Sequence, residues 1–145
     1  MTQRKAEILL VEDNAADVRL AEEIFKEGGL SFNMQVARDG EQALAMLRRE
    51  GEHADLIMPD FVLLDLNLPR KDGREVLAEI KQDPRLKRIP VMVLSTSNAP
   101  RDVLTCYELQ ANAYICKPVD LDEFIDLVES IQAFWMRFAE FPPKD

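Results

Sequence analysis

Short, mainly apolar runs alternate along the chain with longer segments in which apolar residues recur every three or four positions. The runs, which predict β-strands, are Ile8–Val11, Met34–Ala37, Phe61–Leu64, Val91–Leu94 and Ala113–Cys116. The longer segments, which predict amphipathic helices, are Ala15–Glu27, Gly40–Glu50, Gly73–Gln82, Asp102–Leu109 and a last segment from Leu121. Asn14 and Asp120 stand immediately before two of these segments and are expected to be their N-caps. The pattern therefore predicts five successive strand–helix units.

The predicted strands show little alternation of apolar and polar residues, which indicates that both of their faces are buried. Strands of this kind are typical of parallel sheets that are covered by helices on both sides. We therefore expect an α/β fold, a flavodoxin-like (βα)5 doubly wound parallel sheet with strand order 2-1-3-4-5. In this order the carboxyl ends of strands 1 and 3 meet at the switch point, where open α/β sheets bind ligands.

Composition narrows the class of protein. The 145 residues suffice for one domain, and a net charge of −9 opposes binding to nucleic acid or to anionic membranes. The five glycines form no nucleotide-binding loop, and the two cysteines lie ten residues apart, which suits neither a zinc site nor a redox motif. The first residues do not resemble a signal peptide, and no stretch approaches the ~20 apolar residues of a membrane span. We expect a cytoplasmic protein.

Polar residues with complementary chemistry follow the predicted strands. Glu12 and Asp13 follow the first strand and Asp65 the third, while Ser95 and Lys117 follow the fourth and fifth. Each of these residues alone is ordinary at a strand end, but together they would face one cleft. Clustered carboxylates either have a raised pKa or bind a cation, and Mg²⁺ prefers such oxygen ligands. A lysine and a hydroxyl nearby suit the oxygens of a phosphoryl group, so the cleft is expected to hold an aspartate that accepts phosphate.

Four motifs in order resemble those of receiver domains of two-component response regulators. They are LLVEDN (Leu9–Asn14), VLLDLNLPRKDG (Val62–Gly73), IPVMVLSTS (Ile89–Ser97) and NAYICKP (Asn112–Pro118). The resemblance extends from about residue 6 to residue 131. It implies a protein that is phosphorylated by a sensor histidine kinase and assists its own phosphorylation and dephosphorylation, rather than an enzyme. A phosphorelay intermediate that passes the phosphoryl group to a phosphotransfer protein is the alternative.

The resemblance also implies roles for individual residues. Asp65 would be the phosphoacceptor, and Lys117 would contact the phosphoryl group. Mg²⁺ would be held by Asp13, by Asp65, by the backbone carbonyl of Asn67 and, through water, by Glu12. Ser95 and Tyr114 would form the switch pair that reshapes helix 4, strand 5 and helix 5. The Lys117–Pro118 peptide bond would be cis.

Three other classes are disfavoured by particular residues. A phosphatase of the haloacid dehalogenase type requires a second acid two residues after its nucleophile, where this chain has Asn67. A flavodoxin-like carrier of flavin mononucleotide would place its phosphate against Glu12 and Asp13, which repel it. A DNA-binding regulator requires a further domain. The basic segment 70–88, with seven basic against four acidic residues, is interpreted as a solvated helix face or a kinase-docking surface.

The C-terminal residues 132–145 carry an unusual density of aromatic side chains. We assign residues 1–131 to the receiver domain and 132–145 to an aromatic helical extension, with no output domain. If the last helix runs from Leu121 to about Phe141, Phe134, Trp135 and Phe138 lie on turns beyond the sheet. We favour their use in a homodimer through helix 4, strand 5 and helix 5. The alternatives are that the tail folds back on its own domain or that it binds a kinase or target. The tail resembles those of single-domain regulators that partner phytochrome-type histidine kinases.

Overall fold

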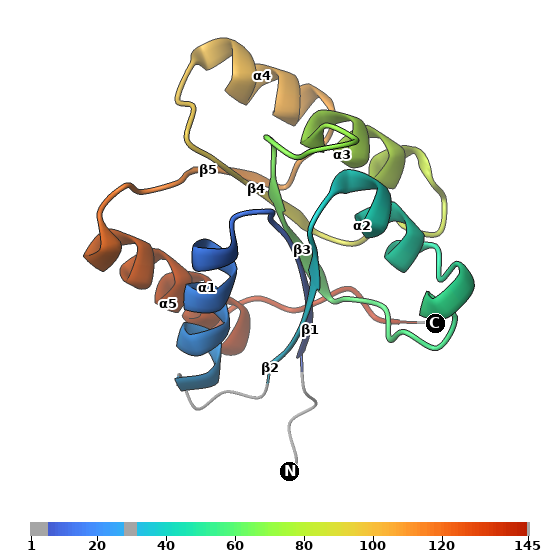
Figure 1. The fold of residues 1–145 in the computed structure, drawn as a ribbon, viewed down its shortest axis with the longest axis horizontal. Coiled ribbons are helices and arrows are strands. Elements are labelled where there is room, and N and C mark those ends of the chain that lie inside the picture. Colours follow the sequence, from blue (N-terminus) through green and yellow to red (C-terminus); the bar gives the residue numbers. More distant parts are fainter. Residues whose placement is uncertain (1–5, 28–31, 145) are drawn as a thin grey trace.

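Five parallel strands form the single sheet found in the computed structural model, which describes residues 6–27 and 32–144 (Figure 1). The strands are β1 (Ala6–Val11), β2 (Phe32–Ala37), β3 (Phe61–Asp65), β4 (Val91–Ser95) and β5 (Ala113–Cys116). Their order is β2-β1-β3-β4-β5, and in the central pair Leu10 lies opposite Leu63. The predicted fold class and strand order are confirmed.

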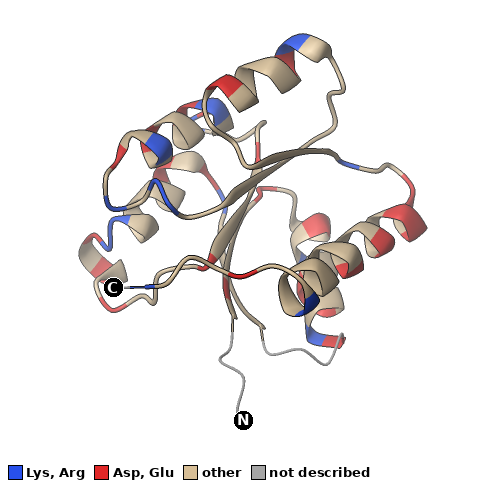
Figure 2. Ribbon diagram, turned by 180° about the vertical axis from the view of Figure 1, so that it is seen from behind, with Lys and Arg blue, Asp and Glu red and all other residues tan. Residues whose placement is uncertain are grey.

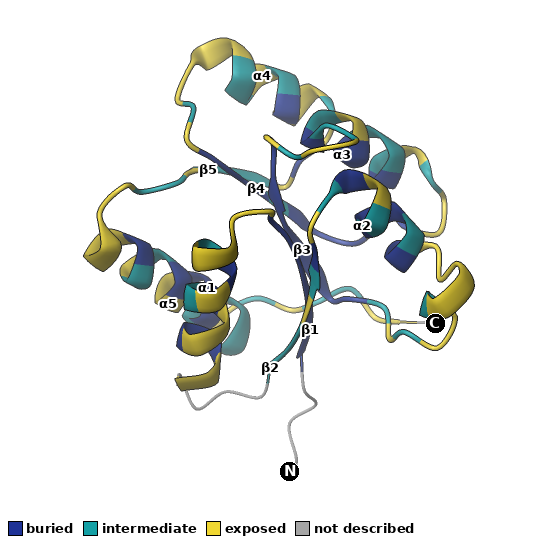
Figure 3. Cartoon of the chain, in the orientation of Figure 1, coloured by how far each residue is buried: buried dark blue, intermediate teal, exposed yellow. Residues whose placement is uncertain are grey.

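Helices cover both faces of the sheet (Figures 1 and 3). They are α1 (Ala15–Glu27) and α5 (Leu121–Arg137) on one face, with α2 (Gly40–Leu47), α3 (Gly73–Gln82) and α4 (Pro100–Glu108) on the other. Ile8 and Leu10 pack in the core beneath α1 and α5, whereas Leu9 and Val11 pack against α2 and α3. Because each strand alternates between two apolar layers, its sequence shows no alternation of its own.

Helix boundaries differ from the predicted ones where backbone geometry intervenes. Asn14 and Asp120 are N-caps as expected, since their side chains accept hydrogen bonds from the N–H groups of Asp17 and Asp122. The second helix ends at Leu47 and not at residue 50, and a 3₁₀ turn, η1 (Gly51–His53), follows it. The fourth helix begins two residues early, at a proline, which is suited to a first helical position. The expected stop at Gly28 lies outside the described residues.

The C-terminal segment does not extend the last helix as far as expected. α5 ends at Arg137, and the chain then crosses the amino ends of the strands (Figure 1). The rings of Trp135 and Phe141 stack on Phe61, the first residue of β3, at centroid distances of 5.3 and 5.8 Å, and on each other at 4.5 Å. The Lys144 ammonium donates to the backbone oxygen of Met58 (2.6 Å). This packing, which local periodicity does not encode, ends the helix early.

Charge is divided unevenly over the surface. Acidic residues gather along α1 and α5, whereas basic residues gather near the C-terminal end of the chain (Figure 2). Within the described residues, no helix is long and apolar enough to cross a membrane.

Candidate functional site

Three carboxylates meet at the carboxyl ends of the two central strands. Glu12 and Asp13 follow β1, and Asp65 ends β3, which is hydrogen-bonded to β1. One carboxylate oxygen from each lies within 4.8 Å of those of the other two. Glu12 and Asp65 are buried, with 2% and 8% of their surfaces exposed, while Asp13 is open to solvent. Parallel pairing thus brings together acids that are more than fifty residues apart in the sequence.

Lys117 reaches this cluster from the end of β5. Its ammonium forms ion pairs with Glu12 (2.5 Å) and with Asp17 of α1 (2.7 Å), and only 10% of its side chain is exposed. Its backbone N–H donates to the oxygen of Ser95 (2.7 Å), which fixes the end of β5 to that of β4. Asp17 was missed by the sequence reasoning, because nothing in the α1 pattern distinguishes it from a solvated acid. No peptide bond of the described residues is cis, so the Lys117–Pro118 expectation is wrong; trans is the lower-energy form of most such bonds.

The electrostatics of the cluster reflect an excess of negative charge. Burial raises the pKa of Glu12 from 4.5 to about 7, and repulsion by Asp65 adds to it, although the hydrogen bond from Lys117 acts in the opposite direction. Burial lowers the pKa of Lys117, but its bonds to Asp17 and Glu12 outweigh burial and hold that pKa above its ordinary value. One ammonium therefore does not neutralise the cluster. Oxygen ligands of this kind, close together and partly exposed, fit a divalent cation such as Mg²⁺ or Mn²⁺.

The loop after β3 shapes the side of the site on which Asp65 lies. Asn67 is exposed, and its backbone N–H donates to the Asp65 carboxylate (3.1 Å), so the residue lies beside the acid; the metal-ligand role of its carbonyl stays a prediction. The Gly73 N–H donates to the oxygen of Leu66 (2.9 Å). A Cβ at Gly73 would lie 2.4 Å from the Asp65 backbone oxygen. Only glycine allows the start of α3 to approach Asp65 so closely, a requirement that the sequence reasoning did not identify.

Ser95 and Tyr114 are joined through one residue of the β4–α4 loop. Ser95 is 1% exposed, and its hydroxyl oxygen accepts a hydrogen bond from the Ser97 N–H (3.1 Å). The Tyr114 hydroxyl donates to the Ser97 backbone oxygen (2.8 Å), and the ring packs against the core between the sheet and α2, α3. Tyr114 thus contacts the loop through Ser97 in this structure.

A further chain of polar contacts anchors the same loop to α3. The Ser97 hydroxyl donates to the Asp102 carboxylate (2.6 Å), which also accepts from the Arg74 guanidinium (3.2 Å). Arg74 in turn contacts Asp72, the N-cap of α3. These residues escaped the sequence reasoning, since they come from three separate loops and helices with no common motif.

The aromatic residues expected at an interface are divided between two environments. Trp135 turns inward onto Phe61, as described above. Phe134 and Phe138 remain on the surface, with 49% and 74% of their area exposed.

The family model, the sequence relative and the solved structures that match this chain are all response regulators. Residues 8–129 match the model of the response regulator receiver domain. Response regulator Rcp1 of Synechocystis sp. is 48% identical over 135 residues, covering 93% of this chain and 92% of Rcp1. The crystal structure of the phosphorylated cyanobacterial phytochrome response regulator RcpA superposes with a TM-score of 0.93 at 49% identity, covering 97% of this chain and all of RcpA. The Mn²⁺-bound form of Rcp1 superposes with a TM-score of 0.91 at 47% identity, covering 95% and 99% of the two chains.

Proposed function

Because the chain belongs to the response regulator receiver-domain family, whose members are signalling phosphoacceptors that bind a divalent metal, we propose that it accepts a phosphoryl group on Asp65 from a sensor histidine kinase, with Mg²⁺. The observation that carries this proposal is the cluster of Glu12, Asp13 and Asp65 within 4.8 Å, beside Lys117. An aspartate at a switch point, with a cation site and a lysine around it, is equipped for phosphoryl transfer.

The transfer itself requires little covalent chemistry from the protein. An oxygen of the Asp65 carboxylate attacks the phosphorus of a kinase phosphohistidine; the new P–O bond forms as the P–N bond breaks, and the imidazole leaves with the electron pair and takes up a proton. Asp13, Asp65 and the Asn67 carbonyl would hold Mg²⁺, with Glu12 acting through water. The ion would supply positive charge to the oxygens of the transferred phosphoryl group. Catalysis consists mainly of positioning and charge neutralisation.

Lys117 provides the second positive charge in this scheme. Its ammonium is bound by Glu12 and Asp17. A bound divalent ion would neutralise the carboxylates and weaken these ion pairs, and the Lys117 ammonium would then be available to a phosphoryl oxygen. The same groups would serve the reverse attack by water, so the protein assists its own dephosphorylation.

Phosphorylation would be transmitted through the β4–α4 loop. We propose that the Ser95 hydroxyl donates to a phosphoryl oxygen, which draws the loop toward Asp65. Because Ser97 bonds to both Ser95 and Tyr114, a shift of the loop moves the tyrosine with it. The surface formed by α4, β5 and α5 changes in consequence.

A second copy of the chain is the proposed occupant of that surface. Seven large apolar side chains are prominently exposed in the described residues, and six of them belong to α4 or to the segment from β5 onward: Leu104, Tyr107, Val119, Leu121, Phe134 and Phe138. Such a concentration is unusual on a monomer, and a twofold contact buries it symmetrically. Trp135 would support this surface from inside and would not itself cross the interface. Analytical ultracentrifugation of the wild type and of Phe138→Asp tests the proposal; a wild type that is monomeric at about 100 μM, a concentration well above a micromolar dissociation constant, with or without phosphorylation, would contradict it.

The similarity to a phytochrome response regulator supports a phytochrome-type kinase as the phosphate donor. The rate of phosphotransfer from such a kinase should be higher than the rate from unrelated histidine kinases at the same concentration.

Intact mass spectrometry with acetyl phosphate and Mg²⁺ tests the central proposal. The wild type should gain the mass of one phosphoryl group, and Asp65→Asn should not. Asp55→Asn, which changes an exposed acid in the loop after η1, is the matched control and should be phosphorylated normally. An adduct formed equally fast on Asp65→Asn would exclude Asp65 as the acceptor.

A further inference from the structure

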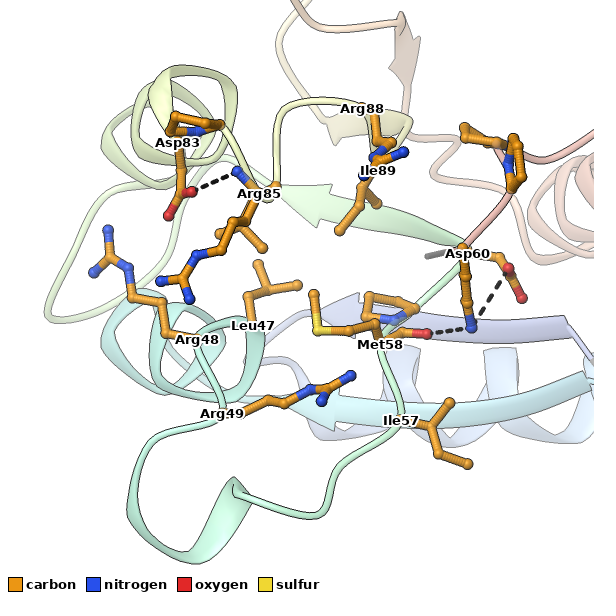
Figure 4. Close-up of a pocket in the computed structure, with 16 residues that line it drawn as sticks. Leu47, Arg48, Arg49, Ile57, Met58, Asp60, Asp83, Arg85, Arg88 and Ile89 are labelled. Carbon is orange, nitrogen blue, oxygen red and sulfur yellow. Dashed lines mark hydrogen bonds and ion pairs between the residues drawn. The ribbon is translucent and has the colours of Figure 1, made fainter.

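A second concave site lies at the amino ends of the strands, opposite the phosphoacceptor. The pocket has a volume of about 610 Å³ and is bounded by the end of α2, the residues before β3, the α3–β4 loop and the C-terminal segment (Figure 4). Asp60, which lines it, precedes β3, whereas Asp65 ends that strand. The pocket is therefore separated from the phosphorylation site by the length of β3, and its volume is in the usual range for small-molecule sites.

The charge of this pocket is opposite to that of the whole chain. Five basic residues line it, Arg48, Arg49, Arg85, Arg88 and Lys144, against two acidic ones, although the net charge of the chain is −9. Arg48 is paired with Glu79 of α3 (3.0 Å). The side chains of Arg49 and Arg85 have no hydrogen bond or ion pair among the described residues. The guanidinium groups of Arg49 and Arg85, which have no partners among the described residues, and that of Arg48 line the same pocket and make a local excess of positive charge.

The floor of the pocket is apolar. Leu47, Leu86 and Ile89 are buried residues that line it, and Met58 lies beside them. In Figure 4, the side chains of Arg48, Arg49 and Arg85 surround Leu47. Prolines 142 and 143 of the C-terminal segment complete the wall. The pocket thus combines an apolar surface for a flat or ring-shaped group with cations at its rim.

We propose that this pocket binds a small organic phosphate, a molecule that joins a phosphate group to an apolar ring, as nucleotides do. A guanidinium group can donate two parallel hydrogen bonds to the oxygens of a phosphate, and it can also stack on the face of a ring. Arg49 and Arg85 can therefore bind either the phosphate or the ring of the ligand. A small ligand is favoured over an acidic peptide or a nucleic acid. A long anionic chain would meet the repulsion of the acidic remainder of the surface, whereas a small anion contacts the basic pocket alone.

Titration with ADP in the absence of metal tests this inference. Binding is followed by calorimetry and by the fluorescence of Trp135, the single tryptophan, because that ring stacks on Phe141 next to the proline wall. We expect saturable binding that weakens about tenfold or more in the double variant Arg49→Gln, Arg85→Gln, since each loses a charge-assisted hydrogen bond. Lysine at both positions should restore part of the affinity. The control variant Arg19→Gln, Arg101→Gln, which removes two exposed arginines elsewhere, should bind as the wild type does.

Several results would overturn the inference. Equal affinity of the wild type and the Arg49, Arg85 double variant would do so, as would inorganic phosphate binding as tightly as ADP, because the apolar floor would then contribute nothing. Tighter binding of polyglutamate than of ADP would identify a peptide site instead. ADP binding that is lost in Lys117→Gln, and kept in the double variant, would place the ligand at the phosphorylation site. Phosphorylation of Asp65 by acetyl phosphate should be unchanged in the double variant, so the two sites are tested separately.

Discussion

Replacing Glu12 with glutamine should stabilise the metal-free protein, and the gain should depend on pH. Glu12 is 2% exposed, and burial together with Asp65 raises its pKa from 4.5 to about 7 despite the bond to Lys117. A folded-state pKa above the unfolded value means that the folded protein binds the proton more tightly. The wild type therefore loses stability as the pH rises from about 4.5 through 7, and the loss is complete above that range.

The size of the effect follows from the two pKa values. At about 1.4 kcal/mol per pH unit, the interval between 4.5 and about 7 corresponds to about 3 kcal/mol, most of which is lost between pH 5 and pH 8. The glutamine side chain resembles the protonated acid and does not titrate. Because the raised pKa already includes the attraction of Lys117, the loss of that ion pair in the variant is part of this difference.

Urea denaturation in EDTA at pH 5 and pH 8 measures this quantity. The free energy of unfolding of Glu12→Gln minus that of the wild type should increase by about 2–3 kcal/mol between the two pH values, and the other titrating groups cancel in the comparison. Glu129→Gln, which changes an exposed acid of α5, should show no such increase. A difference for Glu12→Gln that is the same at both pH values would refute the reasoning. Mg²⁺ should reduce the gain at pH 8, since it neutralises the wild-type carboxylates.

Three further predictions concern the metal, the acceptor loop and the tail. Mg²⁺ at about ten times its dissociation constant should stabilise the wild type by about 1.4 kcal/mol, which corresponds to a rise of about 3–6 °C in melting temperature. Asp13→Asn should lose most of this rise. An equal rise in the wild type and the variant would argue against the cluster as the metal site. Gly73→Ala should lower the free energy of unfolding in urea by about 1–3 kcal/mol and slow phosphorylation by acetyl phosphate, because the new Cβ would displace the loop after β3. A variant that is equally stable and fully active would contradict this. Phe141→Ala should lower the free energy of unfolding by about 2 kcal/mol and shift the fluorescence of Trp135 to longer wavelength. Phe138 is largely exposed, so Phe138→Ala should change the free energy of unfolding by less than about 0.5 kcal/mol. Equal losses in the two variants would show that the stack does not stabilise the tail.

The parts of the structure that could be predicted are those fixed by the sheet. Apolar runs identify buried parallel strands, and parallel strands present their carboxyl ends on one edge. For this reason Asp13, Asp65, Ser95 and Lys117 could be assigned to one site from the sequence, and the structure brings the acids and the lysine together.

Contacts between distant side chains on loops and helices could not be predicted in the same way. The pairing of Lys117 with Asp17 depends on the placement of α1 over the sheet, and the contacts of Ser97 with Asp102 depend on the path of one loop. The end of α5 was misplaced for a related reason. Helical periodicity continues to Phe141, but the stacking of that ring on Phe61 stabilises a turn of the chain that no local pattern encodes.

The stacking of the tail on Phe61 also restricts how β3 can change in length. Phe61 begins this five-residue strand and Asp65 ends it, and since successive side chains alternate, these two residues lie on the same face of the sheet. Insertion or deletion of one residue would turn either Phe61 or Asp65 to the opposite face. Relatives that keep both features should therefore conserve the spacing of four positions between them, while the largely exposed residues 50–55 are free to vary in length. Designed chimaeras that exchange tails between receivers should respect the same spacing.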